Sequence, residues 1–293
     1  MGKIIDQIKA GKILVSDGAW GTFLQQKGMK PGECPEEWNI THPDEVLDIA
    51  KSYIGAGADM IETNSFGGTI FKVEKYGLAD KVFELNKAAA EISRKAAGDK
   101  FVLGSVGPTG KILMMGDVTE KELYEAFKEQ VKGLEAGGVD AIMIETMTDL
   151  DEARLAIQAA KENTNCEVFC TMTFEKTVQG EFRSMMGVSP GEMVNTLIDA
   201  GADLIGANCG NGIADMIGIV EEIRSINSEI PILVHANAGM PIYKDGETVF
   251  PETPDEMSGL VSKIIAAGAN IIGGCCGTTP DHICRVREEV DKI

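Results

Sequence analysis

Two cysteines stand side by side near the end of the chain, in the stretch GGCCGTTPDH at residues 273–282. Thiols serve as metal ligands and as nucleophiles, so this pair is a candidate for chemistry. In an extended strand, neighbouring side chains point to opposite faces, so Cys275 and Cys276 can reach one target only where the strand ends. The surrounding glycines permit such an ending. We therefore expect the pair at the end of a strand.

The segment that leads into this pair belongs to a fourfold repeat. A helix end rich in small residues is followed by an apolar strand in AGADMIETN from residue 56, AGGVDAIMIET from 136, AGADLIGANC from 200 and AGANIIGGCC from 267. Counted from the Asp or Asn that opens each strand, the fifth residue is Asn64, Glu145, Asn208 or Cys275, and the sixth is Ser65, Thr146, Cys209 or Cys276. The repeat therefore predicts that Cys209 lies beside the cysteine pair.

Four further strand candidates alternate with these copies: KILVSDG from residue 12, FVLGSVGP from 101, EVFCTMTF from 167 and PILVHANAG from 231. Capping boxes mark three of the intervening helix starts, at Thr119 with Glu122, Ser189 with Glu192 and Thr253 with Glu256. Eight strand–helix units predict an α/β protein with a TIM (β/α)8 barrel, formed by residues 1–293 as a single domain. The active site of such a barrel lies at the carboxyl ends of the strands, where polar residues gather in this sequence.

Three cysteines that meet at this rim have several chemical uses. A disulfide would leave one thiol without a role, and a reducing compartment disfavours it. A structural zinc site needs a fourth protein ligand, and none is paired with Cys209, Cys275 and Cys276 at the usual short spacing. Three protein ligands and one open position are typical of a catalytic zinc site, and sulfur ligands favour zinc over hard cations such as Mg²⁺. Zinc bound there would convert a substrate thiol into a thiolate.

The overall charge limits the partners. The net charge of −19 argues against nucleic acid or an anionic membrane as a partner, because proteins bind phosphates with cationic side chains. The sequence shows neither a secretory leader nor a run of about 18 apolar residues, so we expect a cytoplasmic protein. Seven cysteines in that setting indicate thiols, metal ligands or catalytic groups better than a disulfide framework.

Several motifs resemble the homocysteine S-methyltransferase family, in particular the homocysteine-binding domain of cobalamin-dependent methionine synthases. They are DGAWGT at residues 17–22, GPTG at 107–110, GANCG at 206–210, NAGMP at 237–241, ETPDEM at 252–257 and GGCCGTTPDH. The resemblance implies a zinc-dependent methyltransferase that holds homocysteine as a zinc thiolate on Cys209, Cys275 and Cys276 and releases methionine. It also implies that Asn237 can approach the zinc ion when substrate is absent.

Homocysteine carries an ammonium and a carboxylate that must be held so that its sulfur reaches the metal. Glu145 and Asp17, at the mouths of two strands, are the acidic residues placed to meet the ammonium, and the family resemblance supports the same assignment. The backbone amides of Gly18 and Ala19 are candidates for the carboxylate. We also expect Asn208 to be a substrate-binding residue. His235 is expected to be a packed residue rather than a zinc ligand.

The methyl donor is expected to come from outside the chain. Cobalamin-dependent methionine synthases continue into folate and cobalamin domains, whereas this sequence stops after the homocysteine domain. We therefore expect a methylated corrinoid carried by a separate protein, received by the rim loops at residues 114–117 and 179–186. A small donor such as betaine or S-methylmethionine is the alternative within the family. A zinc or thiol sensor without turnover is the alternative outside enzyme chemistry.

Overall fold

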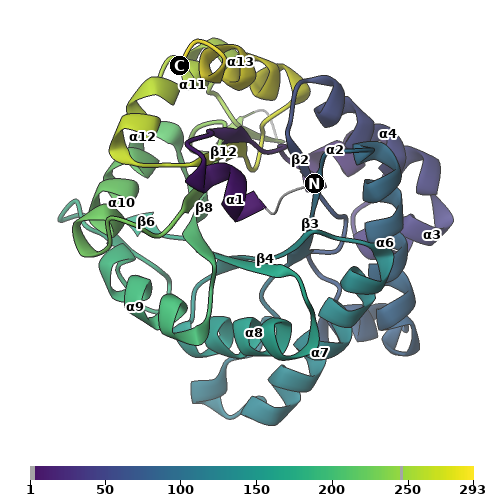
Figure 1. Cartoon of the computed structure of the whole chain (residues 1–293). Coiled ribbons are helices and arrows are strands. Elements are labelled where there is room, and N and C mark those ends of the chain that lie inside the picture. Colours follow the sequence, from purple (N-terminus) through teal and green to yellow (C-terminus); the bar gives the residue numbers. More distant parts are fainter. Residues whose placement is uncertain (1–3, 245–246) are drawn as a thin grey trace.

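The computed structural model describes residues 4–244 and 247–293. Eight parallel strands form one sheet that curves around a central axis, with helices on its outer surface (Figure 1). The strands are β1 (Leu14–Val15), β2 (Met60–Glu62), β3 (Phe101–Val106), β4 (Ala141–Met147), β5 (Glu167–Met172), β8 (Leu204–Gly212), β9 (Ile232–Asn237) and β12 (Ile271–Gly274). All eight predicted strands and the predicted TIM-barrel fold are confirmed.

Helices connect the strands around the outside. They are α1 (Ile4–Lys9), α2 (Gly21–Gln26), α3 (Trp38–Thr41), α4 (Pro43–Gly55), α5 (Ile70–Val73), α6 (Val82–Ala97), α7 (Glu120–Gly137), α8 (Leu150–Asn163), α9 (Pro190–Ala200), α10 (Ile213–Ile226), α11 (Pro254–Ser258), α12 (Val261–Ala267) and α13 (Pro280–Val290), with short 3-10 turns η1 (Pro35–Glu37), η2 (Glu74–Tyr76), η3 (Ala79–Lys81) and η4 (Leu113–Met115). The three predicted capping boxes are confirmed at the starts of α7, α9 and α11. Within the described ranges, each helix is too short or too polar to cross a membrane.

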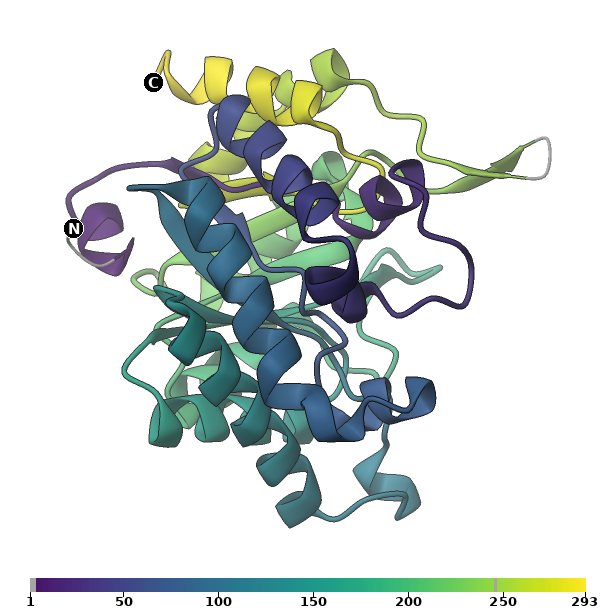
Figure 2. The same cartoon turned by 90° about the vertical axis from the view of Figure 1, so that its right-hand side faces the viewer.

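Two antiparallel hairpins are inserted in the loops at the carboxyl ends of the strands. One is formed by β6 (Glu175–Lys176) and β7 (Phe182–Arg183), and the other by β10 (Ile242–Lys244) and β11 (Glu247–Val249). Figure 2 shows the second hairpin projecting from the molecule on the side opposite α1. The barrel therefore has one end with long loops and one end covered by the N-terminal helix.

Alternation along the strands decides which side chains fill the barrel. On β4, Ala141 and Met143 belong to the inner core, whereas Ile142 and Ile144 pack in the outer core beneath the helices. The inner core closes at the amino ends of the strands, where α1 contributes Ile4 and Ile8. Continuing the alternation along β4 brings Glu145 to the inner side at the opposite end.

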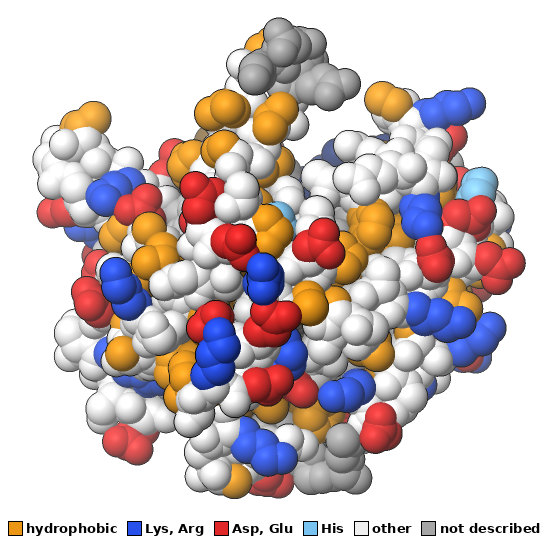
Figure 3. Space-filling model, turned by 90° about the horizontal axis from the view of Figure 1, so that it is seen from above, with side chains coloured by type: hydrophobic (Ala, Val, Ile, Leu, Met, Phe, Trp, Pro, Cys, Tyr) orange, Lys and Arg blue, Asp and Glu red, His pale blue; other side chains and the backbone are white. Residues whose placement is uncertain are grey.

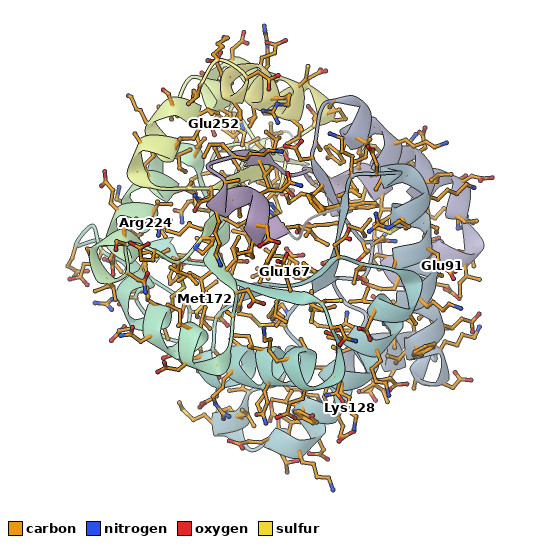
Figure 4. The ribbon with its side chains drawn as sticks, viewed as in Figure 1. Glu91, Lys128, Glu167, Met172, Arg224 and Glu252 are labelled. Carbon is orange, nitrogen blue, oxygen red and sulfur yellow. The ribbon has the colours of Figure 1, made fainter. Side chains whose placement is uncertain are left out.

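A buried carboxylate fixes α1 in this position. Glu167, at the start of β5, accepts hydrogen bonds from the amides of Ile4 at 2.9 Å and Ile5 at 3.3 Å. These amides lie in the first turn of α1, where they have no partner within the helix. Figure 4 places Glu167 near the barrel axis, next to α1. Access to the interior is therefore from the other end.

The repeat seen in the sequence has a physical basis at the amino ends of every second barrel strand, namely β2, β4, β8 and β12. At each of four positions, a backbone amide donates to the carbonyl of a residue on the preceding strand, and the side-chain oxygen accepts from the amide of that same residue. The pairs are Asp59 with Val15, Asp140 with Val102, Asp203 with Val168 and Asn270 with Ile232, with all distances between 2.7 and 2.9 Å. A two-point contact of this kind fixes how far each strand is shifted along its neighbour.

The barrel closes between β1 and β2 through side chains as well as backbone. Besides the contact between Asp59 and Val15, the Asp17 carboxylate accepts a hydrogen bond from the Glu62 amide at 2.9 Å. The same oxygen of Asp17 accepts from the indole Nε1 of Trp20, also at 2.9 Å. Asp17 thereby connects β1, β2 and the loop that enters α2.

The strand-opening contacts can be tested by stability measurements. Asp140→Ala removes the acceptor of the Val102 amide and the partner of Arg94. We expect the free energy of unfolding to fall by about 1–3 kcal/mol, the cost of leaving such a donor without a partner. Asp140→Asn should lose less, because Asn270 fills the equivalent position on β12. In urea denaturation, the exposed Asp199→Ala on α9 serves as the control, and equal losses for Asp140→Ala and Asp199→Ala would contradict this role.

Candidate metal centre and substrate cavity

Three cysteine sulfur atoms converge at the open end of the barrel. Cys209 lies near the end of β8, and Cys275 and Cys276 directly follow the last residue of β12. Their Sγ atoms all lie within 4.8 Å of one another, and those of Cys209 and Cys276 are 3.9 Å apart. The predicted meeting of Cys209 with the distant pair Cys275 and Cys276 is therefore found in the structure.

The backbone after β12 turns so that both neighbouring cysteines face this point. The Cys275 amide still donates to the carbonyl of Ala236 on β9, whereas the Thr278 amide donates back to the Cys275 carbonyl at 3.1 Å and forms a turn. Gly274 faces Thr278, and a Cβ atom there would lie 2.3 Å from Thr278 Oγ1, so glycine is required. The strand end that the glycines predicted is what brings the two sulfur atoms to one side.

Two residues at this end have backbone angles that are unfavourable for their type. Cys209 and Thr146 both have φ near 59°, and they are the non-glycine residues with positive φ in the described chain. Such angles cost free energy, most of all for a β-branched residue such as threonine. Each of the two follows a buried polar residue, Asn208 or Glu145, at a point where the strand register shifts. The strained backbone of Cys209 and Thr146 therefore lies where the chain positions the site residues.

Asn208 holds these strained segments together. Its Oδ1 accepts from the Thr146 amide and from the Thr171 hydroxyl, both at 2.7 Å, and its Nδ2 donates to Thr146 Oγ1 at 2.7 Å and to Glu145 Oε2 at 3.3 Å. Asn208 is fully buried and does not line the cavity described below. Its side chain connects β4, β5 and β8 immediately below the sulfur atoms.

The three thiols perturb one another strongly. Hydrogen bonds from Cys275 and Cys276 lower the pKa of Cys209 to about 3, whereas the pKa of Cys276 is raised to about 11, mainly through its contact with Cys209. The side-chain amide of Asn237, at the end of β9, donates to Cys209 and also lowers its pKa, whereas the Asn237 Oδ1 atom is buried without a hydrogen-bond partner. The cluster thus favours negative charge on one sulfur atom, and three sulfur donors that close together suit a soft cation.

A cavity of about 320 Å³ opens beside the sulfur atoms. Its walls are lined by the loop that enters α2, the residues after β2, the ends of β3 and β4, and the three cysteines. Of the predicted site residues, it is lined by Gly18, Ala19, Glu145, Cys209, Cys275 and Cys276. Asp17, Asn208 and Asn237 lie behind this lining. A separate depression of about 380 Å³ at the other end of the barrel is lined by Asp59 and Arg287, which pair with each other, and by no cysteine.

Buried carboxyl groups lie in and directly behind the lining of this cavity. Burial raises the pKa of Glu145 to about 7, even though the Ser105 hydroxyl donates to it. Burial raises the pKa of Asp17 to about 6, against the hydrogen bonds from the Glu62 amide and Trp20. Burial and the charges of Glu145 and Asp17 raise the pKa of Glu62 well above its usual range. The lining contains no Lys or Arg, so the cavity is suited to cationic groups.

Glu62 lines the cavity and was not among the residues predicted from the sequence. The letters MIET occur twice, at residues 60–63 and 143–146, and this recurrence pairs Glu62 with Glu145. Counting from the opening Asp conceals the pairing, because Glu62 is the third residue after Asp59, whereas Glu145 is the fifth after Asp140. Alternation gives the correct match, since Met60 belongs to the inner core and Glu62 follows it on the same face.

The remaining candidates occupy defined positions. His235 lines the cavity with its Nδ1 atom 3.5 Å from Glu62 Oε1, and burial lowers its pKa to about 3, so the ring is neutral. The Ala19 amide donates to Thr278 Oγ1 at 3.1 Å, so it is already engaged.

Exposed apolar side chains surround the mouth of the cavity. They lie in the loops after β2, β3, β5 and β9, and comprise Phe66, Met114, Met115, Val178, Met185, Met186, Met240, Ile242, Tyr243 and Val249. In Figure 3, where the carboxyl ends of the strands point upward, loops project above the barrel and orange side chains lie on these projections. We call these ten residues the apolar rim.

Comparisons with known proteins agree with this geometry. A sequence model described as homocysteine S-methyltransferase matches residues 14–290. Methionine synthases of Mycobacterium leprae and Mycobacterium tuberculosis are 33% and 32% identical over 97% and 96% of this chain, which spans 25% of the length of each. The metallated form of the homocysteine methyltransferase MmuM from Escherichia coli has the same fold, with a TM-score of 0.79, 21% identity and coverage of 97% of this chain and 98% of that one. The chain therefore belongs to the homocysteine S-methyltransferase family.

Proposed function

We propose that this chain is a zinc-dependent methyltransferase that transfers a methyl group to the sulfur of homocysteine and releases methionine. The observation that carries the proposal is the meeting of three cysteine sulfur atoms beside a cavity walled by buried carboxyl groups. The first feature suits a metal that activates a thiol, and the second suits the ammonium of an amino acid. A thiol sensor would not need the carboxyl groups.

Cys209, Cys275 and Cys276 are the proposed zinc ligands. Three protein ligands leave one position for the substrate sulfur, as in catalytic zinc sites. Zinc bound there would lower the pKa of the substrate thiol, so that homocysteine reacts as a thiolate. Asn237 is the proposed fourth contact in the absence of substrate, because it already hydrogen-bonds Cys209 and has a buried oxygen without a partner. The metallated form of the MmuM homocysteine methyltransferase supports a metal in this fold.

Glu145 is the proposed partner of the homocysteine ammonium. It lines the cavity, whereas the Asp17 carboxylate lies behind the lining and holds the Glu62 amide and Trp20. Asp17 is therefore proposed to act on the ammonium through its negative charge and by fixing the wall, and Asn208 by positioning Glu145. Because the Ala19 amide is engaged by Thr278, Gly18 is the proposed contact of the substrate carboxylate.

A methylated corrinoid carried by a second protein is the proposed donor. The relatives at 33% and 32% identity are methionine synthases, and the apolar rim offers a surface for a macromolecule around the cavity. A methyl-corrinoid donor would supply a methyl cation equivalent: the homocysteine sulfur would form the new bond to carbon with its own electron pair, and the pair of the broken carbon–cobalt bond would stay with the donor. The thiol proton would be lost to solvent on binding at Cys209, Cys275 and Cys276. The transfer therefore needs an in-line approach through the mouth.

Metal analysis tests the sulfur site. Purified protein should hold about one zinc ion per chain, and Cys209→Ser, Cys275→Ser and Cys276→Ser should each lose it, whereas the exposed Cys284→Ser should keep it. X-ray absorption should show one additional sulfur neighbour after homocysteine is added. Full zinc content in all three variants would refute the site, and an unchanged sulfur count with saturating homocysteine would refute thiol activation.

Removal of the Glu145 charge tests the amino-group site. Glu145→Gln keeps the size of the side chain and an acceptor for the Ser105 hydroxyl, but loses the charge that would pair with the ammonium. Homocysteine binding, measured by calorimetry on zinc-loaded protein, should weaken by about 2–5 kcal/mol. Zinc content should be unchanged. Unaltered affinity would place the ammonium elsewhere on the carboxyl wall.

Rates with different donors test the corrinoid proposal. Free methylcobalamin should react slowly, because nothing orients it, and a cognate methyl-corrinoid protein should react much faster. Met114→Glu and Met185→Glu should lower kcat/KM for that protein by about fivefold or more and leave homocysteine affinity unchanged. Ile226→Glu is the matched control, since Ile226 is exposed at the opposite end of the barrel. Rapid turnover with betaine or S-methylmethionine, and none with corrinoid donors, would contradict the corrinoid proposal and identify a small methyl donor instead.

A further inference from the structure

Glu62 has the least satisfied carboxyl group in the cavity wall. Its side chain points from the end of β2 into the inner face of the barrel, and the residue is only 7% exposed. Its Oε1 atom is buried and has no hydrogen-bond donor, and the nearest ring nitrogen, Nδ1 of His235, is 3.5 Å away. Buried polar atoms are nearly always hydrogen-bonded in folded proteins, so an atom of this kind indicates a missing partner.

Neighbouring carboxyl groups do not share this deficit. Glu145 receives hydrogen bonds from Ser105 and Asn208, and Glu36, which also lines the cavity, receives them from the Gly67 amide at 2.7 Å and the Cys34 thiol at 3.3 Å. The groups that raise the pKa of Glu62 besides burial are Glu145 and Asp17, which places three acidic groups close together. A cation between them would offset the cost of their burial.

We propose that Glu62 is a second carboxylate of the amino-group site, where it accepts a hydrogen bond from the substrate ammonium that also contacts Glu145. The inference rests on the proposed function, because it takes homocysteine as the substrate. An ammonium group has three N–H donors, so one carboxylate does not satisfy it. Carboxylates from β2 and β4 that line the same cavity would together hold it along a fixed direction. Glu62 therefore makes the site selective for thiols that carry an amino group.

The experiment compares two ligands that differ only in that group. Calorimetry on zinc-loaded holoenzyme measures the affinity for L-homocysteine and for 4-mercaptobutanoate, which lacks the amino group. In Glu62→Gln, homocysteine should bind about 30-fold or more weakly, with little change for 4-mercaptobutanoate. Glu62→Asp, which keeps the charge on a shorter side chain, should lose less of the discrimination. Glu152→Gln is the matched control, because Glu152 is a buried glutamate outside the cavity lining, and its discrimination ratio should equal that of the wild type.

The outcomes separate this inference from the proposed function. Equal weakening of both ligands in Glu62→Gln, or an unchanged ratio between them, would overturn the role of Glu62 while leaving homocysteine as the substrate. Wild-type protein that does not bind homocysteine, or binds it no better than 4-mercaptobutanoate, would overturn the proposed function itself. Zinc content and circular dichroism confirm that each variant is folded. If Glu62→Gln does not fold, the discrimination ratio of Glu62→Asp decides the role of Glu62.

Discussion

The site depends on the placement of every second strand of the barrel along its neighbours. Each of the strands β2, β4, β8 and β12 is held by a two-point contact between the Asp or Asn that immediately precedes it and the backbone of the barrel strand before it. A slip of one residue would move a sulfur atom by roughly 3.3 Å and turn its side chain to the other face of the sheet. Sulfur atoms 3.9 Å apart, on Cys209 and Cys276, tolerate no such slip. The contacts at one end of the barrel thus fix the geometry at the other.

Much of this arrangement is predictable from sequence because it is periodic. The small-residue helix ends, the opening Asp or Asn and the apolar runs repeat, so strand identity and the meeting of Cys209 with Cys275 and Cys276 follow from counting. Counting from the opening residue misses Glu62, because Glu62 follows Asp59 by three residues whereas Glu145 follows Asp140 by five, although both line the cavity. The function of Asp17 as a contact between β1, β2 and Trp20 also escapes it. Such contacts join residues whose separation follows no period, and they are visible only in three dimensions.

Two features of the site cost free energy of folding, namely strained backbone angles and buried acidic groups. Cys209 and Thr146 have unfavourable backbone angles, and Glu62 and Glu145 are buried acidic groups in a cavity lining that contains no Lys or Arg. Neither feature stabilises the fold, and both are held in place by hydrogen bonds, from Asn208 at the fifth position of the repeat and from Ser105 outside it. A protein selected only for stability would fill these positions with apolar side chains. Their presence is the physical reason to regard this end of the barrel as functional.

The helix that covers the amino end of the barrel has a kinetic consequence. With α1 fixed by Glu167 and its isoleucines in the inner core, everything that reaches the cavity passes through the same mouth. A donor as large as a corrinoid protein would cover that mouth while it reacts. With such a donor, the amino acid would have to enter first, and its methylated product would have to wait until the donor had departed. A barrel closed at one end would then impose an order of arrival and departure, and the rate at which the two proteins separate would set an upper limit on turnover.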